Sequence, residues 1–185
     1  MTMRKVELFT DGACKDNQSE SNIGGYGAVL HYRGHEKEIS GGEENSTNNI
    51  MELKAVIEGL KAIHDKSVIV DVYTDSAYIA NCFKEKWYQG WIARGWRTAA
   101  KKPVENRELW EELLGLVDSF KEVNFYKIKG HLSLRAKELE SWYNQFCVEE
   151  KRVSLEEYKR YIEYNHRADE LASKAALEVG SYGQE

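Results

Sequence analysis

The chain of 185 residues has one proline, three cysteines and no long hydrophobic run. The single proline, Pro103, excludes a proline-rich linker or tail. The cysteines, Cys14, Cys82 and Cys147, have neither the number nor the spacing of a disulfide framework or a metal site. No stretch approaches the ~20 apolar residues of a membrane span. We therefore expect one domain, residues 1–185, in the reducing cytoplasm and without a membrane partner.

The net charge of −5 is not that of a general nucleic-acid binder. Positive charge is concentrated in residues 84–102, a basic handle in which six cations oppose Glu85 alone. Tryptophans alternate with these cations, and basic residues beside aromatic ones suit a surface that follows a nucleic-acid backbone. The alternative is a solvated helix whose tryptophans pack into the core, because Trp87 and Trp91 share one helical face.

The hydrophobic pattern indicates an α/β fold. Alternating apolar residues predict strands at 4–10, 25–33, 35–42, 67–74 and 122–128. Helical spacing predicts helices from about 48 to 64, 76–83, from about 106 to 120, and 165–179. The glycine-punctuated residues 12–25 predict a loop. This order predicts a five-stranded mixed sheet flanked by helices, with strands 1, 4 and 5 parallel.

Two segments nearly repeat each other: residues 6–13 read VELFTDGA and residues 70–77 read VDVYTDSA. If both are neighbouring parallel strands, Asp11 and Asp75 emerge together at the carboxyl edge of the sheet. Carboxylates held that close repel each other unless a cation lies between them. A divalent metal would supply it and would suit chemistry on phosphates. Taken alone, an Asp after a strand is more often a turn residue or a helix cap.

Two further acids are candidates for the same site. Glu52 lies near the start of the first long helix, beside an apolar face where an unpaired charge is costly. Asp169 shares a helical face with Ala172, Ser173 and Ala176, and these small residues allow close approach to the sheet. A lone Glu in a first helical turn is often only a partner of the helix dipole, so the assignment depends on convergence of the acids.

Six segments resemble, in order, the motifs of type 1 ribonucleases H: 8–14 (LFTDGAC), 24–27 (GGYG), 47–54 (TNNIMELK), 73–76 (YTDS), 129–131 (KGH) and 165–172 (NHRADELA). Residues 91–110 resemble the basic handle of the bacterial members. The match covers about 1–133 and 164–179. The resemblance implies the ribonuclease H-like fold and endonucleolytic cleavage of the RNA strand of RNA–DNA hybrids, with 5′-phosphate products.

The same resemblance assigns roles to five residues. Asp11, Glu52, Asp75 and Asp169 correspond to the family's acidic quartet, which implies two Mg²⁺ ions, with Mn²⁺ as a substitute. Asp11 is the candidate for a ligand shared by both ions. His131 corresponds to the family's mobile histidine and suits proton transfer or product release. Its alternative is a surface-loop histidine.

Substrate contacts also follow from the resemblance. Telling RNA from DNA requires contact with the 2′-hydroxyl in the minor groove. The implied contact residues are Gly12, Ala13, Cys14, Asn17, Thr47 and Asn48, together with Trp87, Trp91, Arg94, Trp96, Arg97, Lys101 and Lys102 of the handle. Asn48 has a local alternative as a helix cap. We expect a monomer that binds the hybrid.

The largest departure from the family is an insertion at about 135–163. A stripe from Leu139 to Phe146 and the capping-box sequence at 154–157 predict a helical hairpin. One hypothesis is that it gates product release or adds contacts to the hybrid, although its many acids argue against a direct grip on phosphate. The alternative is a tolerated surface insertion or a docking site for a protein partner.

Two other functions compete with hybrid cleavage. A non-catalytic hybrid-binding or RNA-binding module would be favoured by loss of a metal-ligand acid, and none is lost. A DNA-cutting resolvase or integrase would share the fold, but the GGYG, TNNIMEL and KGH segments and the tryptophan-rich handle argue against it.

Overall fold

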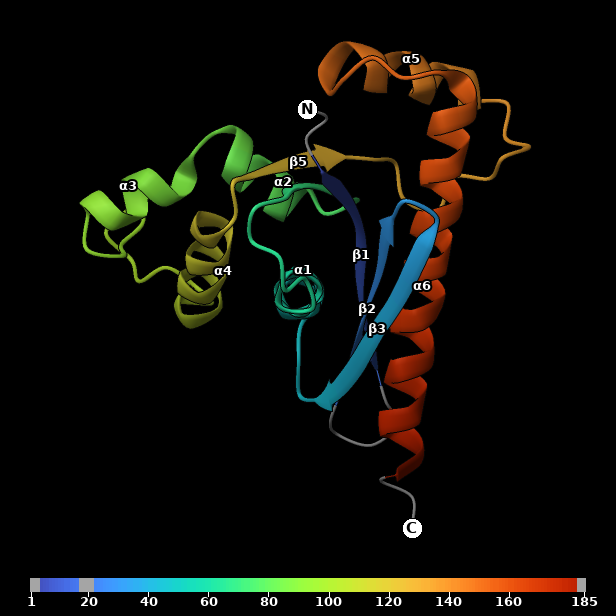
Figure 1. The fold of residues 1–185 in the computed structure, drawn as a ribbon. Coiled ribbons are helices and arrows are strands. Elements are labelled where there is room, and N and C mark those ends of the chain that lie inside the picture. The colour runs from blue at the N-terminus through green and yellow to red at the C-terminus, as the bar shows by residue number, and fades with distance from the viewer. Residues whose placement is uncertain (1–3, 17–21, 183–185) are drawn as a thin grey trace.

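The computed structural model describes residues 4–16 and 22–182 (Figure 1). The elements in chain order are β1 (Lys5–Asp16), β2 (Asn22–Tyr32), β3 (His35–Glu44), α1 (Asn48–Lys61), β4 (Ile69–Thr74), α2 (Ala77–Lys84), α3 (Trp87–Ala93), α4 (Arg107–Ser119), β5 (Glu122–Lys127), α5 (Leu139–Glu149) and α6 (Leu155–Tyr182). None of the helices within these residues is long and apolar enough to cross a membrane.

The five strands form one mixed sheet in the order β3-β2-β1-β4-β5. β1 pairs antiparallel with β2 and parallel with β4, and β4 pairs parallel with β5. This arrangement confirms the predicted sheet. Thr10 lies opposite Thr74 in the parallel pair, so the residues that follow them emerge side by side at the carboxyl edge.

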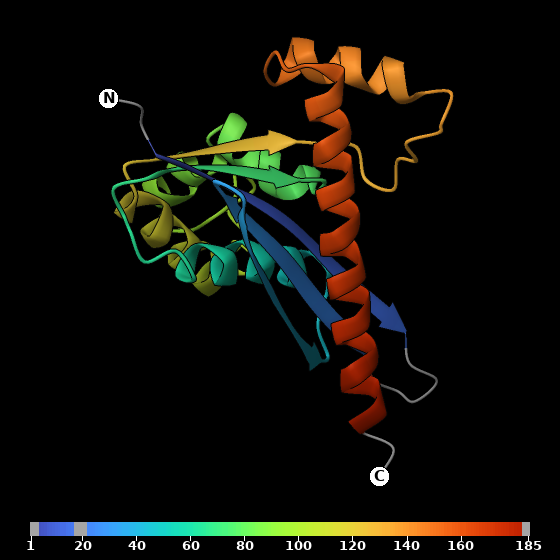
Figure 2. The same ribbon diagram turned by 45° about the vertical axis from the view of Figure 1, so that its right-hand side comes forward.

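Helices cover both faces of the sheet. α6 runs along one face, while α1 lies on the other (Figures 1 and 2). Successive strand residues point to opposite faces, and β1 follows this rule: Leu8 packs with Leu53 and Trp110, whereas its neighbour Phe9 packs with Tyr73. The sheet therefore separates two apolar clusters, one of them shared with the insertion.

The predicted loop at residues 12–25 was wrong. β1 continues to Asp16, and β2 begins at Asn22. Gly25, which suggested a loop, and Gly27 of the predicted strand serve another purpose, because a Cβ on either would overlap backbone atoms of α6. These glycines let α6 lie directly on β2.

α1 and its cap follow from local signals. Thr47 is the N-cap, and its hydroxyl accepts a hydrogen bond from the Ile50 backbone nitrogen at 3.1 Å. The predicted apolar stripe is buried at its centre, at Leu53, Ile57 and Leu60. Its ends were wrong: Ile50 is half-buried and His64 is exposed, because the helix ends at Lys61.

The insertion contains α5 and the first turns of α6. Ser154 caps α6, with its hydroxyl accepting from the Glu157 nitrogen at 3.1 Å. The prediction of a separate helix beginning near 165 was wrong, since α6 is one helix of 28 residues that starts at Leu155. Tyr158 packs against Phe146 of α5, with ring centroids 5.3 Å apart. The insertion is thus continuous with the helix that carries Asp169.

Candidate active site

Three carboxylates meet where β1, β4 and α1 converge. Asp11 follows Thr10 on β1, and Asp75 directly follows β4. Gly12 lies against α1, because a Cβ there would overlap the Glu52 backbone nitrogen. This close approach brings Glu52 to the strand ends, and one carboxylate oxygen from each of the three acids lies within 4.8 Å of the others.

Asp169 and His131 complete the set from α6 and from the loop after β5. Asp169 faces the same depression of about 700 Å³ as the other three acids, and its charge acts on Asp11. Its Oδ2 lies 3.9 Å from His131 Nδ1. The imidazole is 77% exposed, so it can reach both the acids and solvent. The structure therefore brings all five predicted residues together.

The acids disfavour their own ionisation. Burial, followed by the charge of Asp75, raises the pKa of Asp11 to about 8. Burial and the charge of Asp11 hold the pKa of Glu52 well above its usual range, and burial also raises the pKa of Asp75. The Oε2 atom of Glu52 is buried with no hydrogen-bond partner in the part of the chain that the structure describes. These carboxylates need a cation to become ionised together.

Hard divalent cations match this donor set. Mg²⁺ prefers carboxylate, phosphate and water oxygens and retains open positions for a substrate. The cluster offers carboxylate oxygens, including the unpartnered one of Glu52, beside an open depression. The residues present therefore fit a magnesium site.

Comparison with known proteins agrees with this geometry. The family model described as RNase H matches residues 3–177. The chain is 53% identical over 128 residues to a ribonuclease H of Thermus thermophilus, a match that covers 69% of this chain and 74% of that protein. It is 42% identical over 173 residues to a ribonuclease H of Clostridium botulinum, a match that covers 94% of this chain and 96% of that protein. The chain belongs to the ribonuclease H family.

Solved structures show the same fold. LC9-RNase H1, described as a type 1 RNase H with the type 2 active-site motif, superposes with a TM-score of 0.69 at 26% identity, over 96% of this chain and 74% of that one. LC11-RNase H1 in complex with an RNA/DNA hybrid superposes with a TM-score of 0.56 at 19% identity, over 94% and 97%. This ribonuclease H is an endonuclease that hydrolyses the RNA strand of RNA–DNA hybrids.

The predicted minor-groove residues of this ribonuclease H border the acids. Gly12, Ala13, Cys14 and Asn48 line the same depression. Thr47 is exposed beside it, but its hydroxyl serves as the cap of α1, so the alternative role of Asn48 as the cap was wrong. The remaining residue of this group, Asn17, lies outside the described residues.

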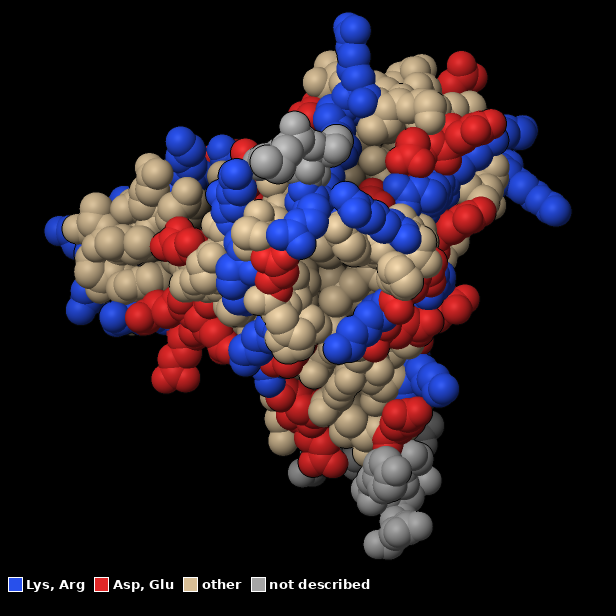
Figure 3. Space-filling model, viewed as in Figure 1, with Lys and Arg blue, Asp and Glu red and all other residues tan. Residues whose placement is uncertain are grey.

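The handle divides into a packed side and a charged side. The ring of Trp91 lies between those of Trp87, Trp96 and Trp110, with centroids 6.4, 6.1 and 5.4 Å away. The handle's tryptophans are half-buried against the core, as the core-packing alternative described. Its predicted cationic contacts are all exposed: Arg94, Arg97, Lys101 and Lys102. Figure 3 shows Lys and Arg around the outer edge of the part of the molecule that contains α3 and the handle.

Sequence reasoning missed some residues of the depression. Lys129 and Ser173 both line it, as does Tyr78. Lys129 opens the KGH segment, and Ser173 lies one helical turn after Asp169, so both carried a local signal. Tyr78 had none, because only the fold places α2 beside the strand ends.

Proposed function

We propose that Asp11, Glu52, Asp75 and Asp169 bind two Mg²⁺ ions and form the catalytic centre that cuts the RNA strand. The observation that carries this assignment is the group of three carboxylate oxygens within 4.8 Å of one another. Its buried members cannot all be ionised at neutral pH without bound cations. Mn²⁺, which also accepts oxygen ligands, is a functional substitute.

Bound Mg²⁺ ions supply an activated water and neutralise the leaving oxygen of the phosphodiester. The chain's own residues orient the site. Asp11 is held in place by a hydrogen bond from the Gly12 nitrogen to its Oδ1 at 2.9 Å. Glu52 is fixed by burial on α1. His131, exposed and 3.9 Å from Asp169, can take a proton at its ring nitrogen and deliver it to solvent or to the departing product.

The substrate lies across the depression and the handle in this proposal. The backbone of residues 12–14 and the side chain of Asn48 face the minor groove, where the 2′-hydroxyl distinguishes RNA from DNA. The exposed cations of the handle contact phosphates of the same hybrid. The packed tryptophans hold these cations outward.

Cleavage of labelled duplexes tests the assignment. We expect Mg²⁺-dependent cutting of the RNA strand in an RNA–DNA hybrid and none of RNA–RNA or DNA–DNA duplexes. Asp11→Asn should abolish cutting while the protein stays folded, and Asp118→Asn, which changes an exposed carboxylate of α4, should cut normally. Binding of the hybrid without cleavage by the unaltered protein would favour the non-catalytic module instead.

We further propose that residues 1–185 act as one monomeric domain in the cytoplasm, with the handle at 84–102 and the insertion at 135–163 as parts of it. All five site residues come from a single chain, and no disulfide joins Cys14, Cys82 and Cys147, which suits a reducing compartment. Light scattering at increasing concentration tests the monomer, and a dimer would refute it. Docking of a protein partner on the insertion is the competing role for that segment.

A further inference from the structure

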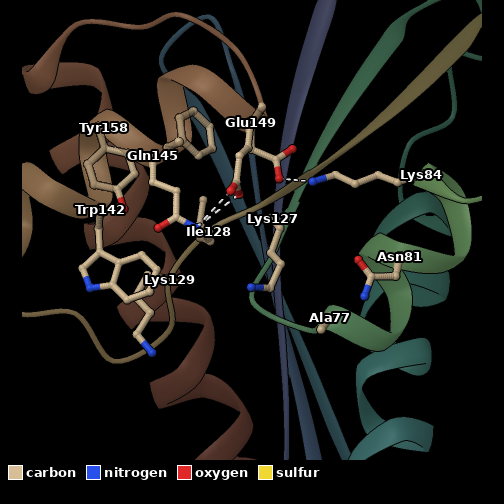
Figure 4. A pocket seen from close by; sticks show the side chains of 12 residues that line it. Ala77, Asn81, Lys84, Lys127, Ile128, Lys129, Trp142, Gln145, Glu149 and Tyr158 are labelled. Carbon is tan, nitrogen blue, oxygen red and sulfur yellow. Dashed lines mark hydrogen bonds and ion pairs between the residues drawn. The ribbon is translucent and has the colours of Figure 1, made fainter.

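A second cavity adjoins the active-site depression. It has a volume of about 210 Å³ and lies between α2, the end of β5 and α5 of the insertion (Figure 4). Ala77 and Lys129 line both this cavity and the depression that holds the acids, so the two lie side by side. A volume below that of a typical small-molecule pocket suits one segment of an extended strand and not a duplex.

The cations of this cavity come from the body of the protein. Residues two apart at the end of a strand point to the same side, and both Lys127 and Lys129 line the cavity while Ile128 between them is buried. Lys127 has no hydrogen-bond or ion-pair partner among the described residues. Lys129 lies over the ring of Trp142, with its Nζ 4.9 Å from the centroid, and forms no ion pair with the residues that the structure describes. Both ammonium groups are exposed and available to an anion.

The lining of the cavity holds three lysines and two acids, so the acids of the insertion offset only part of its positive charge. Glu150 is buried in an ion pair with Lys84 of α2. Glu149 accepts a hydrogen bond from Gln145 at 3.2 Å (Figure 4). The acid content of the insertion suggested that it avoids phosphate. In the fold, its wall of the cavity contains Trp142 and Gln145 as well as the two acids, and it faces Lys127 and Lys129.

This wall is fixed in place. The Glu150–Lys84 pair ties the end of α5 to α2. Next to it, Lys151 donates a hydrogen bond to the Tyr73 hydroxyl at 2.5 Å and lies 4.4 Å from the centroid of Tyr126. The cavity therefore exists before any ligand binds, which lowers the entropic cost of binding.

We propose that this cavity, formed by Lys127, Lys129 and Trp142, binds the RNA strand where it continues past the scissile phosphate as a single strand. The proposal rests on the proposed function, because the strand whose phosphate lies at the acids is the one that reaches the adjoining cavity. The lysines contact phosphates, and the indole stacks on a base. The enzyme would thereby prefer hybrids whose RNA extends beyond the duplex.

Binding of extended hybrids tests this preference in the Asp11→Asn protein with Mg²⁺, which binds without cutting. Anisotropy compares a blunt hybrid with hybrids extended at either RNA end or at either DNA end. One RNA extension should tighten binding at least about fivefold, the value of one stacked base. Lys127→Gln should remove most of that gain and lower the slope of log Kd against log salt by about 0.7.

Matched variants separate the cavity from general charge. Lys121→Gln, at the opposite end of β5, should keep both the gain and the slope. Trp142→Phe should keep the gain because a ring remains, and Trp142→Leu should lose it. Equal Kd values for blunt and RNA-extended hybrids would overturn the proposal, as would equal effects of Lys127→Gln and Lys121→Gln. An equal gain from a DNA extension would overturn the assignment to RNA. Cutting of the blunt hybrid by the unaltered enzyme tests the proposed function separately.

Discussion

Removing one charge from the carboxylate cluster should stabilise the metal-free protein. Asp11 is 4% exposed, and its pKa rises from 3.8 to about 8 in the fold. At about 1.36 kcal/mol per pKa unit, ionising this group within the cluster costs about 6 kcal/mol. Burial contributes most of that cost, followed by the charge of Asp75. Because the three acids titrate together, we assign about 2 kcal/mol to Asp11 alone. Asp11→Asn should therefore raise Tm in EDTA at pH 8 by about 4–8 °C for a domain of this size.

The pH dependence follows from the direction of the shift. The unfolded chain releases the Asp11 proton near pH 4, whereas the folded protein holds it up to about pH 8. The folded state thus binds more protons in this window, and the stability contributed by this group falls as the pH rises through it. The Tm advantage of Asp11→Asn should be absent near pH 4 and largest at pH 8.

Thermal unfolding followed by circular dichroism, with and without Mg²⁺, measures both effects. Mg²⁺ should raise the Tm of the unaltered enzyme by mass action and should have a smaller effect on Asp11→Asn. Asp118→Asn is the control, because it removes an exposed charge of α4 and should change Tm little. Equal Tm values for the enzyme and Asp11→Asn in EDTA from pH 5 to 9 would refute the reasoning.

Other perturbations test the surroundings of the site. Gly130→Ala places a Cβ against the Asp75 carboxylate. The Mg²⁺ concentration that gives half-maximal activity should rise at least about tenfold. An unchanged Mg²⁺ dependence of the activity would contradict this contact. Lys151→Met keeps the packed stem of the side chain but leaves the fully buried Asp71 without one of its partners. The free energy of unfolding, measured in urea, should therefore fall by about 1–3 kcal/mol. An unchanged free energy would mean that the ion pair is not stabilising. Lys101→Gln should leave kcat unchanged and lower the slope of log KM against log salt by about 0.9; an unchanged slope would remove this lysine from the phosphate contacts.

The sequence predicted the acids that the structure brings together, because each has some local signal. Asp11 and Asp75 end two similar apolar runs, and the parallel pairing of those runs brings them together. Glu52 and Asp169 carry less signal alone and depend on the motif order. The handle was ambiguous, because its tryptophans fit both a core and a surface; only the contacts of Trp91 with Trp110 show that they pack inward.

The errors arose where one residue type serves two purposes. Gly25 suggested a loop, yet it lies within β2, where α6 needs a surface without side chains. Ion pairs between residues far apart in the chain could not be predicted from the sequence. Asp71 looks like a solvent-facing strand residue, but it is fully buried and paired with Lys151, 80 positions later. Such pairs depend on how the insertion packs, which local patterns do not encode.

The structure argues against a gating role for the insertion. α6 has neither proline nor glycine from residue 155 to 179, so the insertion and Asp169 share one helix without a hinge. Lifting the insertion off the sheet would expose two large side chains that are now at most 3% exposed, Tyr161 and Ile162. At about 1.5–3 kcal/mol for each, the cost is about 3–6 kcal/mol, which is a large share of the stability of a whole domain. A gate must open for far less than this, and so the segment is better suited to the fixed wall that we propose for the RNA strand.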